Sequence, residues 1–292
     1  MSTRPELKAP PEIYYDDAIA KKYTTNTRNQ QIQAQMTDRA LELLNLSRGK
    51  PALLLDIGCG SGLSGEILEE EGHIWVGMDI SPSMLQVALE REVEGDLFLQ
   101  DIGQGLGFRP GSFDGAISIS VLQWLCNAET SSPTMSPPFR LRRFFTSLHA
   151  SLCGGSRAVF QFYPQSDDQV ELIMSIAMKC GFRGGLVVDY PNSKKAKKFF
   201  LCLFTGGTNS NAHVELPKGL TGEEGPGYED ATHKEVIFEK QRARTKERGK
   251  RKGPKETAKE WILRKKELYR RRGKEGVPTN SKFTGRKRGP KF

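Results

Sequence analysis

Residues 53–62 combine an apolar run, an acid and alternating glycines, a pattern suited to binding a ligand through the backbone. They read Leu-Leu-Leu-Asp-Ile-Gly-Cys-Gly-Ser-Gly, so Asp56 lies at the end of the apolar run and is followed by Gly58, Gly60 and Gly62. An apolar run of this length predicts a buried parallel strand. Glycines directly after a strand permit positive φ and let a ligand lie against bare backbone. We therefore predict a strand, a tight turn and a ligand site at that turn.

The spacing of these glycines distinguishes two kinds of nucleotide site. A dinucleotide fingerprint, G-x-G-x-x-G, counted from Gly58 requires a third glycine where the chain has Leu63. The order Asp-x-Gly-x-Gly-x-Gly instead resembles the first motif of class I S-adenosylmethionine-dependent methyltransferases. This resemblance implies that Asp56 and the three glycines bind S-adenosylmethionine. On these residues alone, the alternative is a glycine-rich turn in an α/β protein of another activity.

A second acid follows at the end of the next predicted strand. Residues 73–80 are largely apolar, and Asp79 comes 17 residues after Gly62. An acid in this place accepts hydrogen bonds from both ribose hydroxyls of a nucleotide. An aspartate at a strand end is also a common helix cap, but Ser81, followed by Pro82, predicts the cap here. Asp79 and the adjoining Ile80 are therefore predicted cofactor residues.

A third predicted strand, residues 96–102, again ends in an acid followed by an apolar residue, Asp101 and Ile102. In the methyltransferase class this pair reads the adenine ring. The resemblance implies that Asp101 accepts a hydrogen bond from the exocyclic amine and that Ile102 offers its backbone amide. Three such strand ends in this order favour the methyltransferase interpretation more than any one alone.

The elements that position these residues predict an α/β fold: a doubly wound, mostly parallel seven-stranded sheet, Rossmann-like, as in class I methyltransferases. An N-terminal helical arm precedes the sheet, and a basic, largely disordered tail follows it. The further strands are predicted at 113–120, 157–163, 185–190 and 198–205, the last two as an antiparallel hairpin. Helices are predicted at 29–47, 64–71, 140–152 (ended by Gly154 and Gly155) and 167–180, with a loop at 127–138 beside the site.

Charge divides the chain into unlike parts. The net charge is +9, but residues 234–292 hold 23 Lys and Arg against 7 Asp and Glu, a net of +16, so residues 1–233 carry −7. A cationic appendage on a mildly acidic body favours polyphosphate partners. We predict three parts: an arm and helix at 1–48 that form a lid over the cofactor site, a methyltransferase domain at 49–205, and an RNA-binding and nuclear-import tail at 206–292. Within the tail, residues 255–272 predict a helix.

Composition excludes several other classes. No run of about 18 apolar residues is present, which predicts no membrane span. The five cysteines form no C-x-x-C pair and the four histidines lie far apart in sequence. We therefore expect no disulfide framework, no metal site and a reducing compartment.

With the tail included, the chain closely resembles the eukaryotic small-subunit (18S) ribosomal RNA (guanine-N7) methyltransferases. The resemblance covers nearly the whole length and is most selective in three motifs: Ser118-Ile-Ser-Val-Leu-Gln-Trp-Leu, Gln161-Phe-Tyr-Pro164, and the closing Ser281-Lys-Phe-Thr-Gly-Arg-Lys-Arg. It implies methylation of N7 of one guanosine of 18S rRNA in small-subunit biogenesis, in the nucleus and nucleolus with possible shuttling to the cytoplasm.

The resemblance also implies a partner, a small zinc-binding activator subunit that adds a strand beside the third strand of the sheet. Residues 96–100, from Asp96 to Gln100, should form an edge strand whose Leu97, Phe98 and Leu99 are unsafe to leave exposed. A partner strand would cover them by β-augmentation. The alternative is that these side chains pack on neighbouring helices of the same chain.

Substrate-positioning residues are predicted where the fourth and fifth strands end. Trp124 is placed to stack on a flipped guanine and Gln123 to meet its edge. Tyr163 and Pro164 end the fifth strand and face the same mouth. For Gln123 and Trp124 the alternative is simple packing at a helix start. Since guanine N7 already carries an exposed lone pair, we expect no general base and assign no catalytic residue.

Further cofactor contacts are predicted outside the glycine turn. Ser118 should lie beneath the methionine moiety. Tyr14, Tyr15, Tyr23 and Arg28 should form the lid, with Arg28 a partner for the cofactor carboxylate. For the tyrosine-rich arm the alternative is a segment that only wraps the core.

Two other functions stay open at this level. A small-molecule methyltransferase, including the carboxylate-esterifying kind, shares the Ser…Leu-Gln-Trp strand end but needs no cationic tail. A ribosome assembly factor whose presence matters more than its chemistry would need the tail without the methyl transfer.

Overall fold

The computed structural model describes residues 4–47, 49–126, 136–193, 196–206 and 216–220, with Leu263, Lys266, Thr279 and Asn280. Spatial contacts divide the chain into the units Met1–Tyr228 and Glu229–Phe292, and the fold below is that of the first unit. Residues 127–135 of the predicted loop, and most of the predicted tail helix at 255–272, lie outside the described residues.

The sheet has seven strands in the order β3-β2-β1-β4-β5-β7-β6. Neighbours from β3 to β5 run parallel, whereas β7 lies antiparallel between β5 and β6. The predicted α/β class, the doubly wound parallel order and the final antiparallel hairpin are therefore confirmed. The strands are β1 (Leu53–Ile57), β2 (Ile74–Asp79), β3 (Asp96–Leu99), β4 (Phe113–Ile119), β5 (Leu152–Phe162), β6 (Arg183–Asp189) and β7 (Lys198–Phe204).

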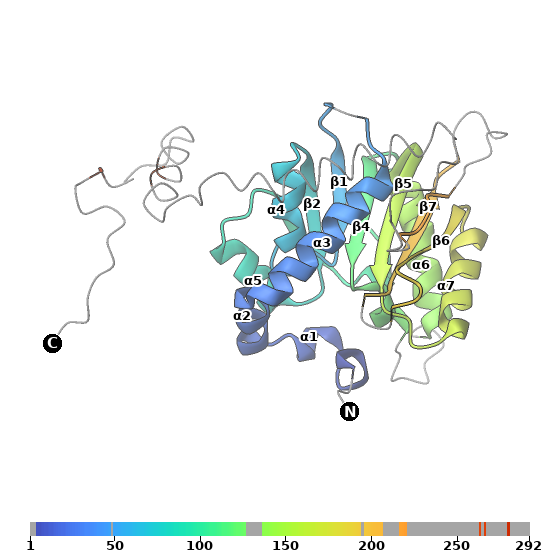
Figure 1. Cartoon of the computed structure of the whole chain (residues 1–292), viewed down its shortest axis with the longest axis horizontal. Helices are drawn as coiled ribbons and strands as arrows, with labels where there is room; N and C mark the ends of the chain where they lie inside the picture. Colours follow the sequence, from blue (N-terminus) through green and yellow to red (C-terminus); the bar gives the residue numbers. More distant parts are fainter. Residues whose placement is uncertain are drawn as a thin grey trace. The chain divides into compact units, whose positions relative to one another are not determined.

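Helices cover both faces of this sheet, as Figure 1 shows for α3 crossing in front of it. Leu43 of α3 and Leu68 of α4 pack in a buried cluster on one face, and Phe144 of α6 and Ile173 of α7 pack in a second cluster on the other. The α-helices are α1 (Pro11–Tyr14), α2 (Asp17–Thr25), α3 (Thr27–Leu44), α4 (Leu63–Glu70), α5 (Pro82–Glu90), α6 (Pro137–Ser151) and α7 (Asp167–Lys179). Short 3-10 turns are η1 (Pro5–Leu7), η2 (Ile102–Gln104) and η3 (Leu122–Cys126). No described helix is long and apolar enough to cross a membrane.

The junction of α6 and β5 differs from the prediction. We expected Gly154 and Gly155 to end the helix, but α6 ends at Ser151 and β5 begins at once with Leu152. The glycines lie inside the strand, where the register against β4 shifts. Gly155 has φ +83°, a conformation that side chains rarely adopt. These glycines therefore form a bulge that a sequence reading cannot distinguish from a helix stop.

Packing continues beyond Thr205, where we expected the domain to end. Residues 216–220 return to β6, where Leu220 donates its N–H to Asp189 (2.9 Å). Asp189 also receives two hydrogen bonds from Arg39 of α3, from Nε at 2.9 Å and Nη2 at 3.2 Å. Arg39 in turn donates to the carbonyl of Lys218 (3.1 Å). A buried ion pair thus ties the first long helix, the sheet edge and this returning segment together.

This ion pair predicts a stability change. Arg39→Met should lower the free energy of unfolding by about 3 kcal/mol, because it leaves the buried Asp189 carboxylate without its charged partner. Urea unfolding measures the change. As a control, Lys21→Met removes the exposed pair of Lys21 with Glu90 (3.5 Å) and should cost well under about 1 kcal/mol. Equal losses in the two variants would contradict the importance given to the buried pair.

Candidate active site

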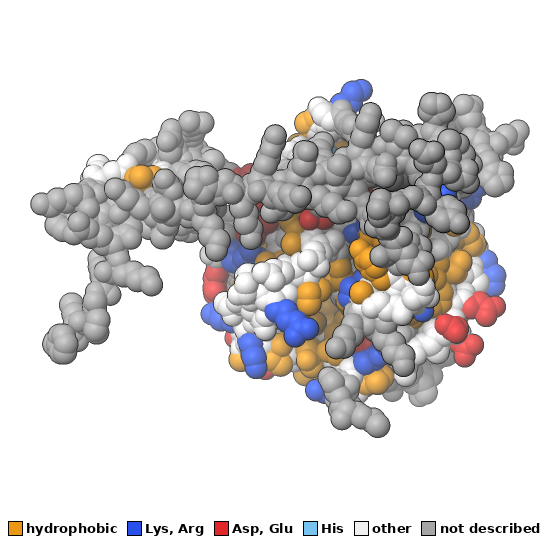
Figure 2. All heavy atoms as spheres, in the orientation of Figure 1, with side chains coloured by type: hydrophobic (Ala, Val, Ile, Leu, Met, Phe, Trp, Pro, Cys, Tyr) orange, Lys and Arg blue, Asp and Glu red, His pale blue; other side chains and the backbone are white. Residues whose placement is uncertain are grey.

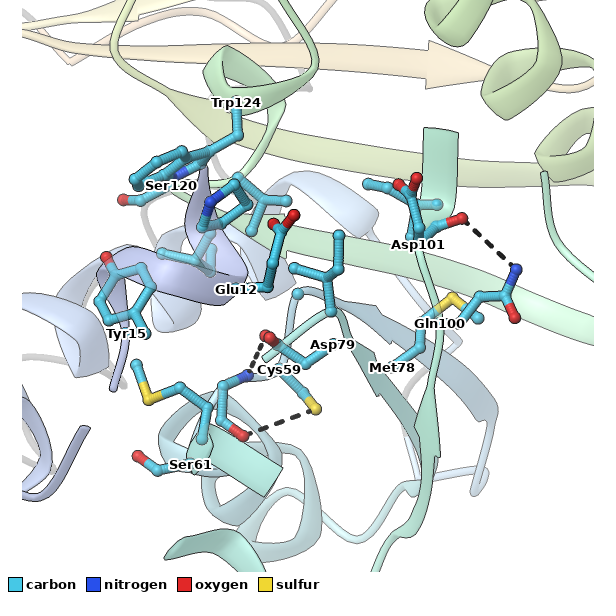
Figure 3. A pocket seen from close by; sticks show the side chains of 18 of the residues that line it. Glu12, Tyr15, Cys59, Ser61, Met78, Asp79, Gln100, Asp101, Ser120 and Trp124 are labelled. Atoms are coloured by element: carbon cyan, nitrogen blue, oxygen red, sulfur yellow. Dashed lines mark hydrogen bonds between the residues drawn. The ribbon is translucent and has the colours of Figure 1, made fainter. Parts of the chain in front are cut away.

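A cavity of about 360 Å³ lies where β1, β2 and β4 reach their carboxyl ends, a size typical of small-molecule sites. Figure 3 shows it from close by, with the N-terminal arm on one side and the strand ends on the other. Of the predicted residues, the cavity is lined by Tyr15, Tyr23, Gly58, Gly60, Asp79, Ile80, Asp101, Ile102 and Trp124. These residues come from distant parts of the sequence, and parallel strands bring them together.

The glycine turn is shaped by backbone geometry. Gly58 and Gly60 have φ of +73° and +54°. A Cβ on Gly58 would come within 2.1 Å of the Val121 side chain, so only glycine fits there. Gly58 and Cys59 both donate their N–H to the carbonyl of Met78, at 2.7 and 3.1 Å. The turn is thus fastened to β2 and exposes bare backbone to the cavity.

Asp79 joins three segments at the floor of the cavity. Its Oδ2 accepts the N–H of Gly60 (2.9 Å) and its Oδ1 accepts the N–H of Ser81 (2.8 Å). Ser81 caps α5 as predicted, since its hydroxyl accepts from the N–H of Met84 (3.2 Å). Ser81 therefore takes the capping role, while the Asp79 carboxylate accepts these two backbone donors as well. Each carboxylate oxygen still has a further lone pair for a ligand.

Asp101 is held by a residue that the sequence did not indicate. Arg140, from the first turn of α6, donates Nη2 to Asp101 Oδ1 at 2.7 Å, and the N–H of Gly103 donates to the same oxygen at 2.9 Å. Both bonds use Oδ1, so Oδ2 stays available to a ligand. Arg140 lies 39 residues from Asp101, and no local spacing signals such a contact.

The N-terminal arm closes one side of the cavity. Arg4 donates to the carbonyls of Tyr163 and Pro164, both at 3.0 Å. Ser81 donates its hydroxyl to the carbonyl of Tyr15 (3.0 Å). The ring of Tyr15 lies 5.9 Å from that of Trp124. Burial raises the pKa of Tyr15, so its phenol stays neutral. The arm therefore spans from the tip of β5 to the start of α5.

Other predicted residues lie outside the cavity lining. Ser118 is buried and donates its hydroxyl to the carbonyl of Ile57 (2.8 Å), beneath the turn. Gly62 precedes the first residue of α4 with φ +79°. Arg28 is exposed in the first turn of α3. Tyr163 receives a hydrogen bond from Lys198 Nζ at its hydroxyl (2.9 Å).

Gln123 occupies a packing position instead of facing the cavity. Its Nε2 donates to the carbonyl of Ser120 (2.8 Å), and its Oε1 accepts the N–H of Tyr163 (3.4 Å). Both polar ends are thus used to join the ends of β4 and β5. This matches the packing alternative for Gln123, whereas its neighbour Trp124 lines the cavity.

Asp56 is fully buried behind the turn and lies outside the cavity lining. Its Oδ2 accepts the hydroxyl of Ser64 (2.6 Å), while its Oδ1 has no hydrogen-bond partner. Its pKa is raised to about 7, because burial and the charge of Asp79 raise it by more than the hydrogen bond from Ser64 lowers it. Burial likewise raises the pKa of Asp79, against the lowering effect of its backbone donors. Two acids therefore share a poorly solvated region next to the site.

A parallel sheet with this order, a glycine turn after β1 and acids ending β2 and following β3 together define a class I methyltransferase. A family model described as a methyltransferase domain matches residues 55–136, and one described as a methyltransferase involved in Williams-Beuren syndrome matches residues 203–290. A ubiquinone biosynthesis O-methyltransferase of Xanthomonas campestris is 33% identical, but over only 25% of this chain and 32% of its own.

Similarity over the whole length identifies the family. The 18S rRNA (guanine-N(7))-methyltransferase of Mus musculus is 54% identical, covering 100% of this chain and 99% of its own. RID2 of Arabidopsis thaliana, with the same enzyme name, is 54% identical and covers 100% of both chains. The 18S rRNA (guanine(1575)-N(7))-methyltransferase of Saccharomyces cerevisiae is 54% identical, covering 99% of this chain and 100% of its own. The chain belongs to the 18S rRNA (guanine-N7)-methyltransferase family.

S-adenosylmethionine is the cofactor of this family, and the cavity fits it. Gly60 gives the ligand a surface without a side chain. Asp79 offers lone pairs to a ribose diol, and Asp101 offers Oδ2 to the adenine amine. When bound, the cofactor supplies an electrophilic methyl group on sulfur. We propose that these three residues with Gly58, Ile80, Ile102 and Tyr15 contact it directly, and that Asp56, Gly62 and Ser118 support the turn from below.

The role of Asp79 is testable with a small change. Asp79→Asn should weaken binding of S-adenosylhomocysteine by at least about 10-fold, because the amide turns an N–H₂ toward a backbone donor and removes the charged acceptor. Isothermal calorimetry measures the affinity, and thermal unfolding of the variant checks that the fold persists. Unchanged affinity in a folded variant would contradict the assignment.

Asp56 predicts a pH dependence of stability. An aspartate in the unfolded chain has a pKa of about 3.9, whereas the folded value is about 7. The folded state therefore binds the proton more tightly, and stability falls as the pH rises from about 4 through 7. Relative to Asp56→Asn, which cannot ionise, the wild type should lose about 2 kcal/mol of unfolding free energy between pH 5 and 7. Urea unfolding at both pH values measures this, and a constant difference would contradict it.

Proposed function

We propose that the chain transfers the methyl group of S-adenosylmethionine to N7 of a guanosine in 18S rRNA, during biogenesis of the small ribosomal subunit. The observation that carries the proposal is 54% identity, over 99% or more of this chain, to three enzymes named for that reaction. The cavity supports it, since Trp124 lines it together with Gly60, Asp79 and Asp101, the proposed cofactor contacts.

The reaction requires little of the protein beyond positioning the cofactor and the base. Guanine N7 carries a lone pair in the plane of the ring, so methyl transfer requires no proton to be removed first. Alignment of the two reactants alone supplies several kcal/mol of rate enhancement. Trp124 lies against Tyr14 and Tyr15, with ring centroids 6.0 and 5.9 Å away. When one of these tyrosine rings moves aside, Trp124 gives a flipped base a stacking surface beside the cofactor.

Covalent catalysis by the nearest thiol is disfavoured. Cys59 lines the cavity, but its side chain is buried and burial raises its pKa, as do the charges of Asp56 and Asp79. A thiol with a raised pKa is a poor nucleophile. Direct transfer from cofactor to base therefore fits the site better than a route through the enzyme.

We assign binding of the rRNA backbone to the basic tail. Figure 2 shows Lys and Arg of the described residues scattered over the visible face rather than gathered on it. Residues 234–292 carry a net charge of +16 by sequence. Such charge binds phosphates with little choice of sequence. We assign the arm within residues 1–48 to the lid, and residues 49–205 with the packed segment 216–220 to the methyltransferase domain. The rest of 206–292 is assigned to rRNA and pre-ribosome binding and nuclear import, with location in the nucleus and nucleolus.

The edge strand β3 supports a heterodimer with a small zinc-binding activator subunit. β3 pairs with β2 alone in the described sheet, which leaves its other edge open. Phe98 and Leu99 on it are 47% and 62% exposed, and Ile74 of β2 is 64% exposed. An open edge beside apolar side chains is prone to pair with another chain. A strand added by a partner would satisfy both features.

Two other functions fit less well. A small-molecule methyltransferase would need neither the charge of residues 234–292 nor similarity that extends through them. A ribosome assembly factor that acts by its presence is compatible with the tail, and it is the second candidate because such a role can coexist with catalysis.

The proposed reaction is tested by mapping N7-methylguanosine in 18S rRNA. Borohydride and aniline cleave the RNA at this modification, so cells with the protein should yield a cleavage product that depleted cells lack. Asp79→Asn should also lack it. Normal amounts of small subunit in that variant would assign the main cellular role to the assembly function, and cleavage that persists without the protein would contradict the proposal.

The heterodimer is tested on the edge strand. Phe98→Asp should abolish copurification of the activator subunit and lower the soluble yield, because the charge lies where the partner strand would pack. Phe139→Asp is the matched control, since Phe139 is also exposed (38%) but lies on α6. Retention of the activator by the Phe98 variant would contradict this interface.

A further inference from the structure

Glu12 brings a carboxylate into the cavity that the cofactor contacts do not use. It belongs to α1 of the N-terminal arm and lines the cavity, and Figure 3 shows its side chain projecting between Trp124 and Asp79. Among the described residues its carboxylate has no hydrogen-bond or ion-pair partner. Glu6 also lines the cavity but is paired with Arg4 (3.4 Å). Glu12 is thus an acceptor of hydrogen bonds at the mouth of the site.

The arm fixes where this carboxylate lies. Arg4 ties the chain before α1 to the end of β5, and Ser81 ties Tyr15, directly after α1, to the start of α5. Pro11 occupies the first position of α1, which restricts its backbone. Because both flanks of this short helix are anchored, its backbone is held beside the cavity that Glu12 lines.

The chemistry of the two substrates indicates which one Glu12 meets. Asp101 and Asp79 already provide acceptors for the adenine amine and the ribose hydroxyls. The third donor of the cofactor, the ammonium of its methionine moiety, is the competing ligand that the calorimetry below tests. The phosphates of an RNA are repelled by a carboxylate. Guanine alone among the four bases presents two adjacent donors on its Watson–Crick edge, N1–H and the 2-amino group. A carboxylate accepts both at once, since it has two oxygens and no donor of its own.

We propose that Glu12 selects guanine, accepting hydrogen bonds from N1–H and the 2-amino group while the base stacks on Trp124. The inference rests on the proposed function and names the residue that gives it base specificity. Adenine, which has an acceptor at N1, would face the carboxylate with a lone pair. Glu12 therefore rejects adenine as well as binding guanine.

The same contact favours the reaction itself. As the N7–CH₃ bond forms, the C–S bond breaks and its electron pair stays on sulfur, so the cofactor leaves as a neutral thioether and the base gains the positive charge. The hydrogen bonds from N1–H and the 2-amino group to a carboxylate strengthen as this charge develops. Glu12 thus binds the transition state more tightly than the neutral guanosine.

The test combines a protein change with a base change. Inosine lacks the 2-amino group but keeps N7, so rRNA carrying inosine at the mapped target is compared with rRNA carrying guanosine, in single-turnover methylation. Wild type should methylate inosine about 10- to 100-fold more slowly. Glu12→Gln should be slower on guanosine by a similar factor and should discriminate much less between the two bases. Glu6→Gln is the matched control and should keep the wild-type ratio.

The outcomes distinguish failure of this inference from failure of the proposed function. If Glu12→Gln keeps the full guanosine-to-inosine ratio, guanine selection by Glu12 is overturned although the methyl transfer stands. If it instead weakens S-adenosylhomocysteine binding in calorimetry, Glu12 serves the cofactor and the inference is likewise overturned. If the wild type does not methylate the guanosine substrate, the proposed function fails first and this inference fails with it.

Discussion

The hydrogen bonds of Asp79 hold the site together. One carboxylate accepts the N–H of Gly60, in the turn after β1, and the N–H of Ser81, which begins α5. These bonds offset the cost of desolvating an acid, whose pKa burial nevertheless raises. The strand ends on which the cofactor contacts depend are therefore positioned by a group that is itself a predicted ligand. Structure and binding cannot be separated at this residue, so a variant there must be checked for both.

Acidic and basic charge are divided between the cavity and the tail. Four acidic side chains line the cavity: Glu6, Glu12, Asp79 and Asp101. Among the described residues, the basic side chain that lines it is Arg140, which is paired with Asp101 at 2.7 Å. Such a cavity suits a cationic sulfonium and a base that becomes cationic, and it repels phosphates. Affinity for an RNA must then come from elsewhere in the assembly, and the net charge of +16 in residues 234–292 is the available source.

The parts of the site that the sequence predicted are those set by local rules. The glycine turn, Asp79 and the Ser81 cap follow from spacing at strand and helix ends, and each lies where it was expected. Arg140 and Glu12 were not predicted, because each reaches the cavity only after distant segments have packed. The bulge at Gly155 was misread for a related reason, since glycine permits a helix stop and a strand bulge equally well.

A base can reach Trp124 only if part of the N-terminal arm moves aside. The rings of Tyr14 and Tyr15 occupy positions beside Trp124, and each such aromatic contact stabilises the closed arm by about 0.5–1.5 kcal/mol. Stacking of a nucleic-acid base on an aromatic side chain contributes about 1–3 kcal/mol. The exchange of a tyrosine ring for a base is therefore close to balanced or favourable. Glu12 lies on the same short helix as Tyr14. A guanine that donates hydrogen bonds to the Glu12 carboxylate therefore makes the exchange more favourable, whereas a base without adjacent donors does not. Opening of the arm and choice of the base are in this way coupled through one turn of helix.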